Sequence, residues 1–188
     1  MGEVLRTTTE PIVGQIRLAW WRDRLQELDA GTAPAEPRLQ AASRELLPAG
    51  LTGAELAALS GGWWRLFDPF PWDIQTAEAI WFRGRYLFGL AARIVGGPSE
   101  DAEAAGGAWA LVDVARHCSD PKSRAMLLEQ ARTQSEGLTQ MRFPPVLRPL
   151  SMLAAVARRD ALKGEPFEAE GRAARLALML HHRLTGRI

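Results

Sequence analysis

Three side chains that could act on a ligand lie within five residues of one another: Asp113, Arg116 and His117. In a helix over residues 105–121 they cluster beside an apolar face. That face consists of Ala108, Leu111, Val112 and Ala115. An acid, a guanidinium and an imidazole placed in this way are typical of a helix that lines a pocket. The alternative is a core helix whose last turn carries solvated polar groups.

The start of the same segment predicts close contact with a neighbouring helix. Gly106, Gly107 and Ala108 follow one another there. Glycine has no side chain and alanine only a methyl group, so a second helix can come close at this point. We therefore expect residues 105–121 to form the wall of a pocket.

The composition limits the classes of protein. The 188 residues suffice for one domain with its own core, and the net charge of +1 provides no basic field for nucleic acid. The single cysteine, Cys118, excludes an internal disulfide and suits a reducing compartment. Apolar runs are shorter than the roughly 20 residues that span a bilayer. We expect a cytoplasmic protein with no transmembrane segment, no nucleic-acid partner and no cofactor.

The residue pattern predicts an all-α fold. Ala, Leu, Arg and Glu are abundant while Ile, Thr and Tyr are few, and no segment alternates as a strand would. With their caps, the expected helices cover residues 12–29, 38–47, 52–67, 73–95, 99–120, 121–139, 146–163 and 166–184. We predict one helical domain over residues 1–188.

The helical pattern also predicts where individual side chains lie. Thr52 and Glu55 have the spacing of a capping box, and Ser99 is expected to cap the helix that follows it. We expect Cys118 to be a semi-buried, inert thiol. The predicted core includes Ile16, Trp20, Ile74, Val95, Leu176, Leu178, Leu180 and Leu184, and the predicted surface includes Arg83, Arg85, Arg93, His181 and His182.

Three stretches resemble the squalene/phytoene synthase family. Residues 15–29 (QIRLAWWRDRLQELD) are similar to a family segment in which an arginine, a leucine and one or two tryptophans precede a polar helical stretch. Residues 86–96 (YLFGLAARIVG) are similar to its tyrosine followed by a Val-Ala-Gly-x-Val-Gly-like segment. Residues 105–117 align without a gap with its second signature helix, L-G-x-A-x-Q-L-x-N-I-L-R-D. The resemblance covers nearly the whole chain and implies the isoprenoid (terpenoid) synthase type of helical bundle.

The chain departs from that family where magnesium is held. Active members join two prenyl diphosphates head to head and hold Mg²⁺ with two aspartate-rich motifs. In the second motif, His117 stands in place of the first aspartate and Pro121 in place of the aspartate four residues later. The first motif would lie shortly before Arg17, but only sixteen residues precede Arg17 in this sequence. The resemblance thus implies a chain without a metal site that lacks the family's N-terminal helix or helices.

We interpret the chain as a catalytically degenerate squalene/phytoene synthase-like protein. It would bind an isoprenoid or other lipidic ligand, or it would bind a protein partner and act as an assembly factor. Divergent family members without the aspartates assemble respiratory complex I, and residues 16–21 resemble those members at least as well as the active ones. The candidates for ligand binding are Arg17, Trp21, Tyr86, Trp109, Asp113, Arg116 and His117. No residue is assigned a catalytic role or a metal.

Two other functions stay open. One is a prenyltransferase that condenses two prenyl diphosphates with Mg²⁺ and whose missing first motif lies upstream of this sequence. Without that motif, Arg17 and Arg116 could still bind an anionic head group. The other is a plain helical interaction module whose centre is filled by Trp20, Trp81 and Trp109.

The role of the polar cluster and the state of assembly are open as well. Asp113 and His117 could pair with one another or with Arg116, as a structural network in a former active site. A missing helix would leave apolar surface exposed, which predicts a homodimer or peripheral contact with a membrane surface.

Overall fold

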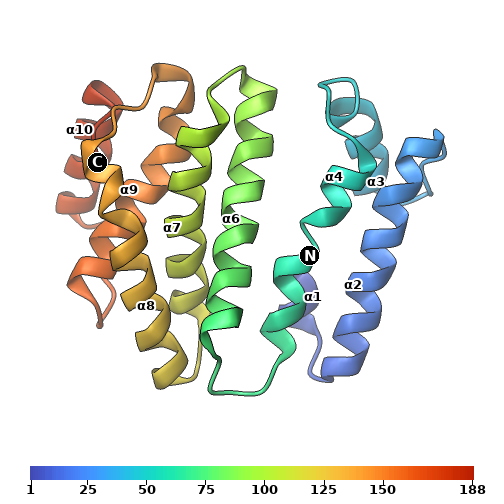
Figure 1. The fold of residues 1–188 in the computed structure, drawn as a ribbon, viewed down its shortest axis with the longest axis horizontal. Helices are drawn as coiled ribbons and strands as arrows, with labels where there is room; N and C mark the ends of the chain where they lie inside the picture. Colours follow the sequence, from blue (N-terminus) through green and yellow to red (C-terminus); the bar gives the residue numbers. More distant parts are fainter. The chain divides into compact units, whose positions relative to one another are not determined.

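The computed structural model describes residues 1–188 and consists of helices, turns and one isolated bridge between Arg142 and Arg187. The chain divides into two compact units, residues 1–69 and residues 70–188. Figure 1 shows that both units are built from helices. The predicted all-α class is therefore confirmed. The isoprenoid synthase type and the single domain stay predictions.

The first unit contains short helices around one longer one. Its elements are α1 (Gly2–Thr7), α2 (Pro11–Gln26), a 3-10 turn (Glu27–Ala30), α3 (Pro37–Ala41), a π-helical turn (Ala42–Leu46), α4 (Gly53–Ala58), α5 (Gly61–Trp64) and a 3-10 turn (Arg65–Phe67). The predicted continuous helix to residue 67 is wrong, because α4 ends at Ala58 and the chain turns at Leu59 and Ser60. Gly61 and Gly62, which weaken a continuous helix, begin the separate helix α5.

The predicted capping box at the start of α4 is confirmed. The hydroxyl of Thr52 accepts a hydrogen bond from the Glu55 amide at 3.1 Å, and the Glu55 carboxylate accepts one from the Thr52 amide at 2.8 Å. The carboxylate of Asp29, after α2, accepts from the amides of Gly53 and Ala54 at 2.5 and 2.9 Å. These contacts fix the start of α4 against the end of α2.

The buried face of α2 is narrower than predicted. Leu18 is fully buried and Gly14 packs against the ring of Phe67. In contrast, Ile16 is 63% exposed and Trp20 45% exposed. The prediction that these two residues belong to the core is wrong, because α1, α4 and α5 cover only one side of α2.

The second unit contains the long helices. Its elements are α6 (Ile74–Val95), α7 (Ser99–His117), α8 (Pro121–Ser135), two 3-10 turns (Gly137–Gln140 and Pro145–Leu147), α9 (Arg148–Lys163) and α10 (Ala173–Thr185). Asp73 caps α6 through the Thr76 amide at 2.9 Å, and Asp120 caps α8 through the Ser123 amide at 2.8 Å. The predicted cap at Ser99 is wrong by one residue, since Pro98 takes that position.

Helix α7 lies at the centre of the second unit. It packs against α6, α8 and α9, and more than half of its residues are buried. At the crossing with α6, a Cβ on Gly106 would overlap the carbonyl oxygen of Gly84, and a Cβ on Gly84 would overlap that of Gly106. Gly107 packs against the indole of Trp81. The small residues therefore allow close approach of α6, as expected.

Three side chains of α6 differ in exposure from the prediction. Arg83 was expected at the surface but is only 6% exposed, while Ile74 and Val95 are exposed. The inner face of α6 follows Ala77, Ile80 and Phe88, and Arg83 falls within it. Ile74 and Val95 share that face by the helical period, but they are the first and last residues of α6, and both are exposed.

The orientation of α10 also differs from the prediction. Leu176, Leu180 and Leu184 were expected in the core but lie at the surface, and Leu178 is half-buried. His182 was expected at the surface and is fully buried, whereas His181 is exposed as predicted. The His182 ring lies with Nδ1 2.9 Å from the Arg187 carbonyl oxygen and Nε2 2.8 Å from the Ser151 hydroxyl. These polar contacts fix the face of α10 that meets α9.

Gly106→Ala is expected to destabilise the second unit by about 1–3 kcal/mol, because the new methyl group must push two packed backbones apart. Urea denaturation followed by circular dichroism measures the free energy of unfolding. Gly137→Ala is the control, since a Cβ there meets no atom within 4 Å. Equal losses of stability in the two variants would contradict the close crossing of α6 and α7.

Candidate functional site

The seven predicted ligand-binding residues are divided between the two units. Arg17 and Trp21 belong to α2 of the first unit, and the other five belong to α6 and α7 of the second. Nη1 of Arg17 donates to the hydroxyls of Thr7 and Thr8 at 3.1 and 2.5 Å. The Trp21 ring meets that of Trp20 edge to face, with centroids 5.2 Å apart. Arg17 thus ties α2 to the segment that precedes it.

Trp109 has a packing role in the second unit. Its ring stacks on Phe88 of α6, with centroids 5.2 Å apart and an angle of 26° between the planes. It also borders a buried cluster that includes Phe143 and Leu147. Tyr86 is half-buried on α6. The Trp109 ring therefore forms part of the packed interface between α6 and α7.

Arg116 is held by a buried carboxylate that is not among the predicted site residues. Its Nη1 lies 2.6 Å from one carboxylate oxygen of Asp160 on α9, and Nη1 of Arg175 on α10 lies 2.5 Å from the other. Asp160 is 2% exposed, and the guanidinium of Arg116 also lies 5.0 Å from the centre of the Phe167 ring. A buried carboxylate between two guanidiniums connects α7, α9 and α10.

The charged groups of Asp113, Arg116 and His117 do not pair with one another, which was one of the arrangements left open by the sequence. Nδ1 of His117 lies 2.7 Å from the backbone carbonyl oxygen of Asp113, not from its carboxylate. The negative charge of Asp113 acts instead on Arg83 of α6. Burial lowers the pKa of Arg83 to about 10, and the Asp113 charge partly opposes that shift. The three residues therefore have different partners, because each lies at a different angle around α7.

The sequence contains a pattern that indicates the burial of Asp160. This residue follows Ala154 and Ala157 at helical spacing and precedes Ala161, so it falls on the buried face of α9. An acid on such a face requires a cationic partner. The pattern does not say which cation that is, since Arg116 lies 44 residues away in the chain.

Cys118 is more deeply buried than predicted, and its inertness stays a prediction. It is 5% exposed, and burial raises the pKa of the thiol. No three side chains of His, Cys, Asp or Glu are grouped so that they could hold a metal ion. None of the helices has both the length and the apolar character needed to cross a bilayer.

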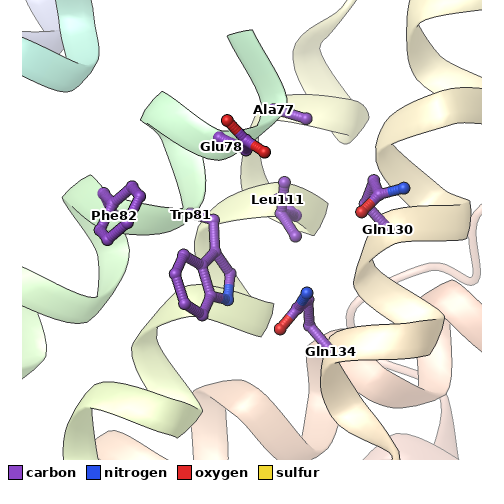
Figure 2. A pocket seen from close by; sticks show the side chains of 7 residues that line it. All are labelled: Ala77, Glu78, Trp81, Phe82, Leu111, Gln130 and Gln134. Atoms are coloured by element: carbon purple, nitrogen blue, oxygen red, sulfur yellow. The ribbon is translucent and has the colours of Figure 1, made fainter. Parts of the chain in front are cut away.

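The second unit has a pocket between α6, α7 and α8. Its volume is about 210 Å³. Figure 2 shows Trp81 and Phe82 of α6 on one side, Gln130 and Gln134 of α8 on the other, and Leu111 of α7 between them. Ala77 and Glu78 complete the lining. The pocket therefore combines an apolar floor and aromatic wall with two amides and one carboxylate.

Comparisons with protein-family models, curated proteins and solved structures find no match to this chain.

Packing orients the aromatic wall of the pocket. The indole of Trp81 rests on Gly107, and the guanidinium of Arg85 lies 4.5 Å from the centre of its ring. Arg85 is held in turn by Glu103 of α7 at 2.9 Å. Of the predicted residues none lines the pocket, although Leu111 belongs to the predicted helix face. Trp81 and Phe82 were missed because adjacent aromatic residues in a helix are equally typical of a core.

Asp160→Asn is expected to lower the free energy of unfolding by about 3 kcal/mol, because Arg116 and Arg175 then lose their counter-charge. Arg116→Met is the matched variant and is expected to cost about 1 kcal/mol, since the pair of Asp160 with Arg175 survives. Urea denaturation measures both. Wild-type stability in both variants would show that Arg116 is not a structural residue.

A pH dependence is expected from Glu168, between α9 and α10. Nε of Arg159 lies 2.7 Å from its carboxylate and Nζ of Lys163 lies 3.1 Å from it. These contacts lower the pKa of Glu168 to about 2. The unfolded chain, with the ordinary pKa near 4.3, binds the proton first, so stability is lost as the pH falls from about 5 to about 2.

The Glu168→Gln variant is therefore expected to lose less stability than the wild-type protein when the pH falls from about 5 to about 2. The urea midpoints of both proteins at successive pH values measure this difference. Glu136→Gln is the control, because Glu136 is exposed and forms no ion pair. An identical pH profile for all three proteins would exclude the ion pairs of Glu168.

Proposed function

We propose that this chain is a catalytically inactive binding protein, of the squalene/phytoene synthase type that its sequence resembles, and that it holds part of an isoprenoid or other lipidic ligand. The observation that carries the proposal is the ion pair of Arg116 with Asp160 at 2.6 Å. Asp160 already neutralises this guanidinium, so a diphosphate that recruited Arg116 would compete with a buried carboxylate for it. Displacing that carboxylate completely would cost several kcal/mol.

The pocket on α6 supports a ligand of lipidic character. Trp81, Phe82 and Leu111 offer apolar contact, whereas the two glutamines offer hydrogen bonds to a hydroxyl or carbonyl group. The carboxylate of Glu78 repels a diphosphate. An uncharged isoprenoid, such as an alcohol, suits this lining better than a prenyl diphosphate.

The size of the pocket limits how much of the ligand it holds. Its volume of about 210 Å³ is below the range of about 300–1,000 Å³ that is usual for whole small-molecule ligands. One end of an isoprenoid chain would therefore occupy the pocket, with the rest along the exposed ring of Phe82, which is 61% exposed.

Equilibrium dialysis with labelled farnesol and farnesyl diphosphate tests the proposal. Farnesol is expected to bind more tightly than the diphosphate. Phe82→Ala is expected to weaken farnesol binding about fivefold, through loss of apolar contact with an exposed ring. Glu78→Gln is expected to narrow the preference for farnesol, because it removes the carboxylate that repels the diphosphate.

Leu153→Ala is the control for both variants, since Leu153 is 45% exposed and lies outside the pocket. If Phe82→Ala and Leu153→Ala weaken farnesol binding equally, the pocket is not the binding site. Incubation of the chain with farnesyl diphosphate and Mg²⁺ is expected to give no condensation product. A head-to-head product that is lost in Arg116→Met would favour the prenyltransferase instead.

A further inference from the structure

Helix α10 has one packed face and one face without a neighbour. It packs mainly on α9, beside which Figure 1 shows it. Arg175 and His182 are its buried residues, at 7% and 0% exposure. Both are fixed by polar contacts, Arg175 to Asp160 and His182 to Ser151. The rotation of α10 about its axis is thereby set.

The face opposite these contacts is apolar. Leu176, Leu180 and Leu184 are 56%, 58% and 69% exposed. Their spacing of four residues places them in one row along the helix, about 12 Å long at 1.5 Å per residue. Ala173 and Ala177 lie beside that row. The leucine row, defined as Leu176, Leu180 and Leu184, is thus a continuous apolar strip at the surface.

The leucine row is accompanied by positive charge. Arg172, Arg183 and Arg187 are exposed, and none of them forms an ion pair with a carboxylate. Helix α10 contains no acidic residue. By the helical period, Arg183 lies at the edge of the row, and Arg172 directly precedes the helix.

The acids of the preceding segment do not neutralise these arginines. Glu165 pairs with Arg124, and Glu168 pairs with Arg159 and Lys163. Glu170 is exposed and precedes α10 by three residues. The surface of α10 therefore keeps a net positive charge next to its leucines.

We propose that α10 docks this protein on the surface of an anionic lipid bilayer. An amphipathic helix with leucines on one face and arginines at its edge lies in the plane of the interface, with the leucines among the acyl chains. The arginines then meet lipid phosphates. This surface is separate from the pocket on α6, so the docking does not depend on the proposed ligand.

The charge pattern favours a membrane over a second copy of the chain. In a symmetric dimer through this strip, the arginines of one copy would approach those of the other. Three leucines on a helix of thirteen residues also provide far less than the roughly 800 Å² per partner that a stable interface buries. An anionic bilayer matches both the apolar strip and its positive edge.

Co-sedimentation of the full chain with vesicles tests the proposal. One set contains phosphatidylcholine alone and the other contains in addition about 30% phosphatidylglycerol, which supplies the negative surface. The protein is expected to bind the anionic vesicles more tightly and to be released in part by high salt, because the arginine contribution is screened.

Two variants locate the binding surface. Leu176→Ser together with Leu180→Ser is expected to weaken binding to anionic vesicles about a hundredfold, roughly tenfold per leucine withdrawn from the acyl chains. Arg183→Gln is expected to weaken it about fivefold, as for one basic residue near the surface. Circular dichroism verifies that the variants keep their helical content.

The matched controls lie in the first unit. Ile12→Ser with Ile16→Ser removes two apolar side chains that are 72% and 63% exposed, and Arg44→Gln removes an exposed positive charge. Both controls are expected to bind as the wild type does. Failure to bind anionic vesicles, equal binding to both vesicle types, or equal losses in controls and α10 variants would overturn the proposal. If light scattering shows a dimer, and the double leucine variant is a monomer, then a second copy of the chain covers the leucine row.

Discussion

The second unit depends on the burial of one carboxylate. Asp160 lies on the inner face of α9 at 2% exposure, where an uncompensated negative charge would be strongly unfavourable. Two guanidiniums compensate it, Arg116 from α7 and Arg175 from α10. Arg175 is buried by this contact, and Arg116 stays partly exposed. The same contact fixes how α10 is rotated against α9.

The crossing of α6 and α7 is the second constraint. Because Gly84 and Gly106 carry no side chains, the two helices approach closely enough for Trp81 to rest on Gly107. Arg85 stacks over that indole and is held by Glu103. The aromatic wall of the pocket is therefore built by backbone approach and supported by an ion pair.

Local signals predicted the elements better than their orientation. The predicted helices over residues 73–95 and 121–139 begin where α6 and α8 begin, and the structure shows Asp73 and Asp120 as their caps. Caps act within one turn, so a short stretch of sequence contains them completely. The early predicted start of α10 had no such cap, and the helix begins at Ala173.

The candidate site could be predicted only in part, because its partners are distant in the chain. The helix of Asp113, Arg116 and His117 was located correctly, and so was its close contact with a neighbour. The partner of Arg116 was not, since Asp160 belongs to another helix. A periodic pattern gives the faces of a helix but not the residues that each face meets.

Helix α10 shows how buried polar contacts decide between two possible faces. One face presents leucines in a row, and the other presents Arg175 and His182 beside Leu178. Apolar periodicity alone favours burial of the leucines. The structure buries the polar face, because a carboxylate, a serine hydroxyl and a backbone carbonyl are available there as partners. Because α10 buries its polar groups and leaves its leucines exposed, it retains an apolar surface. The unpaired arginines beside the leucines favour a negatively charged surface as the one that covers them.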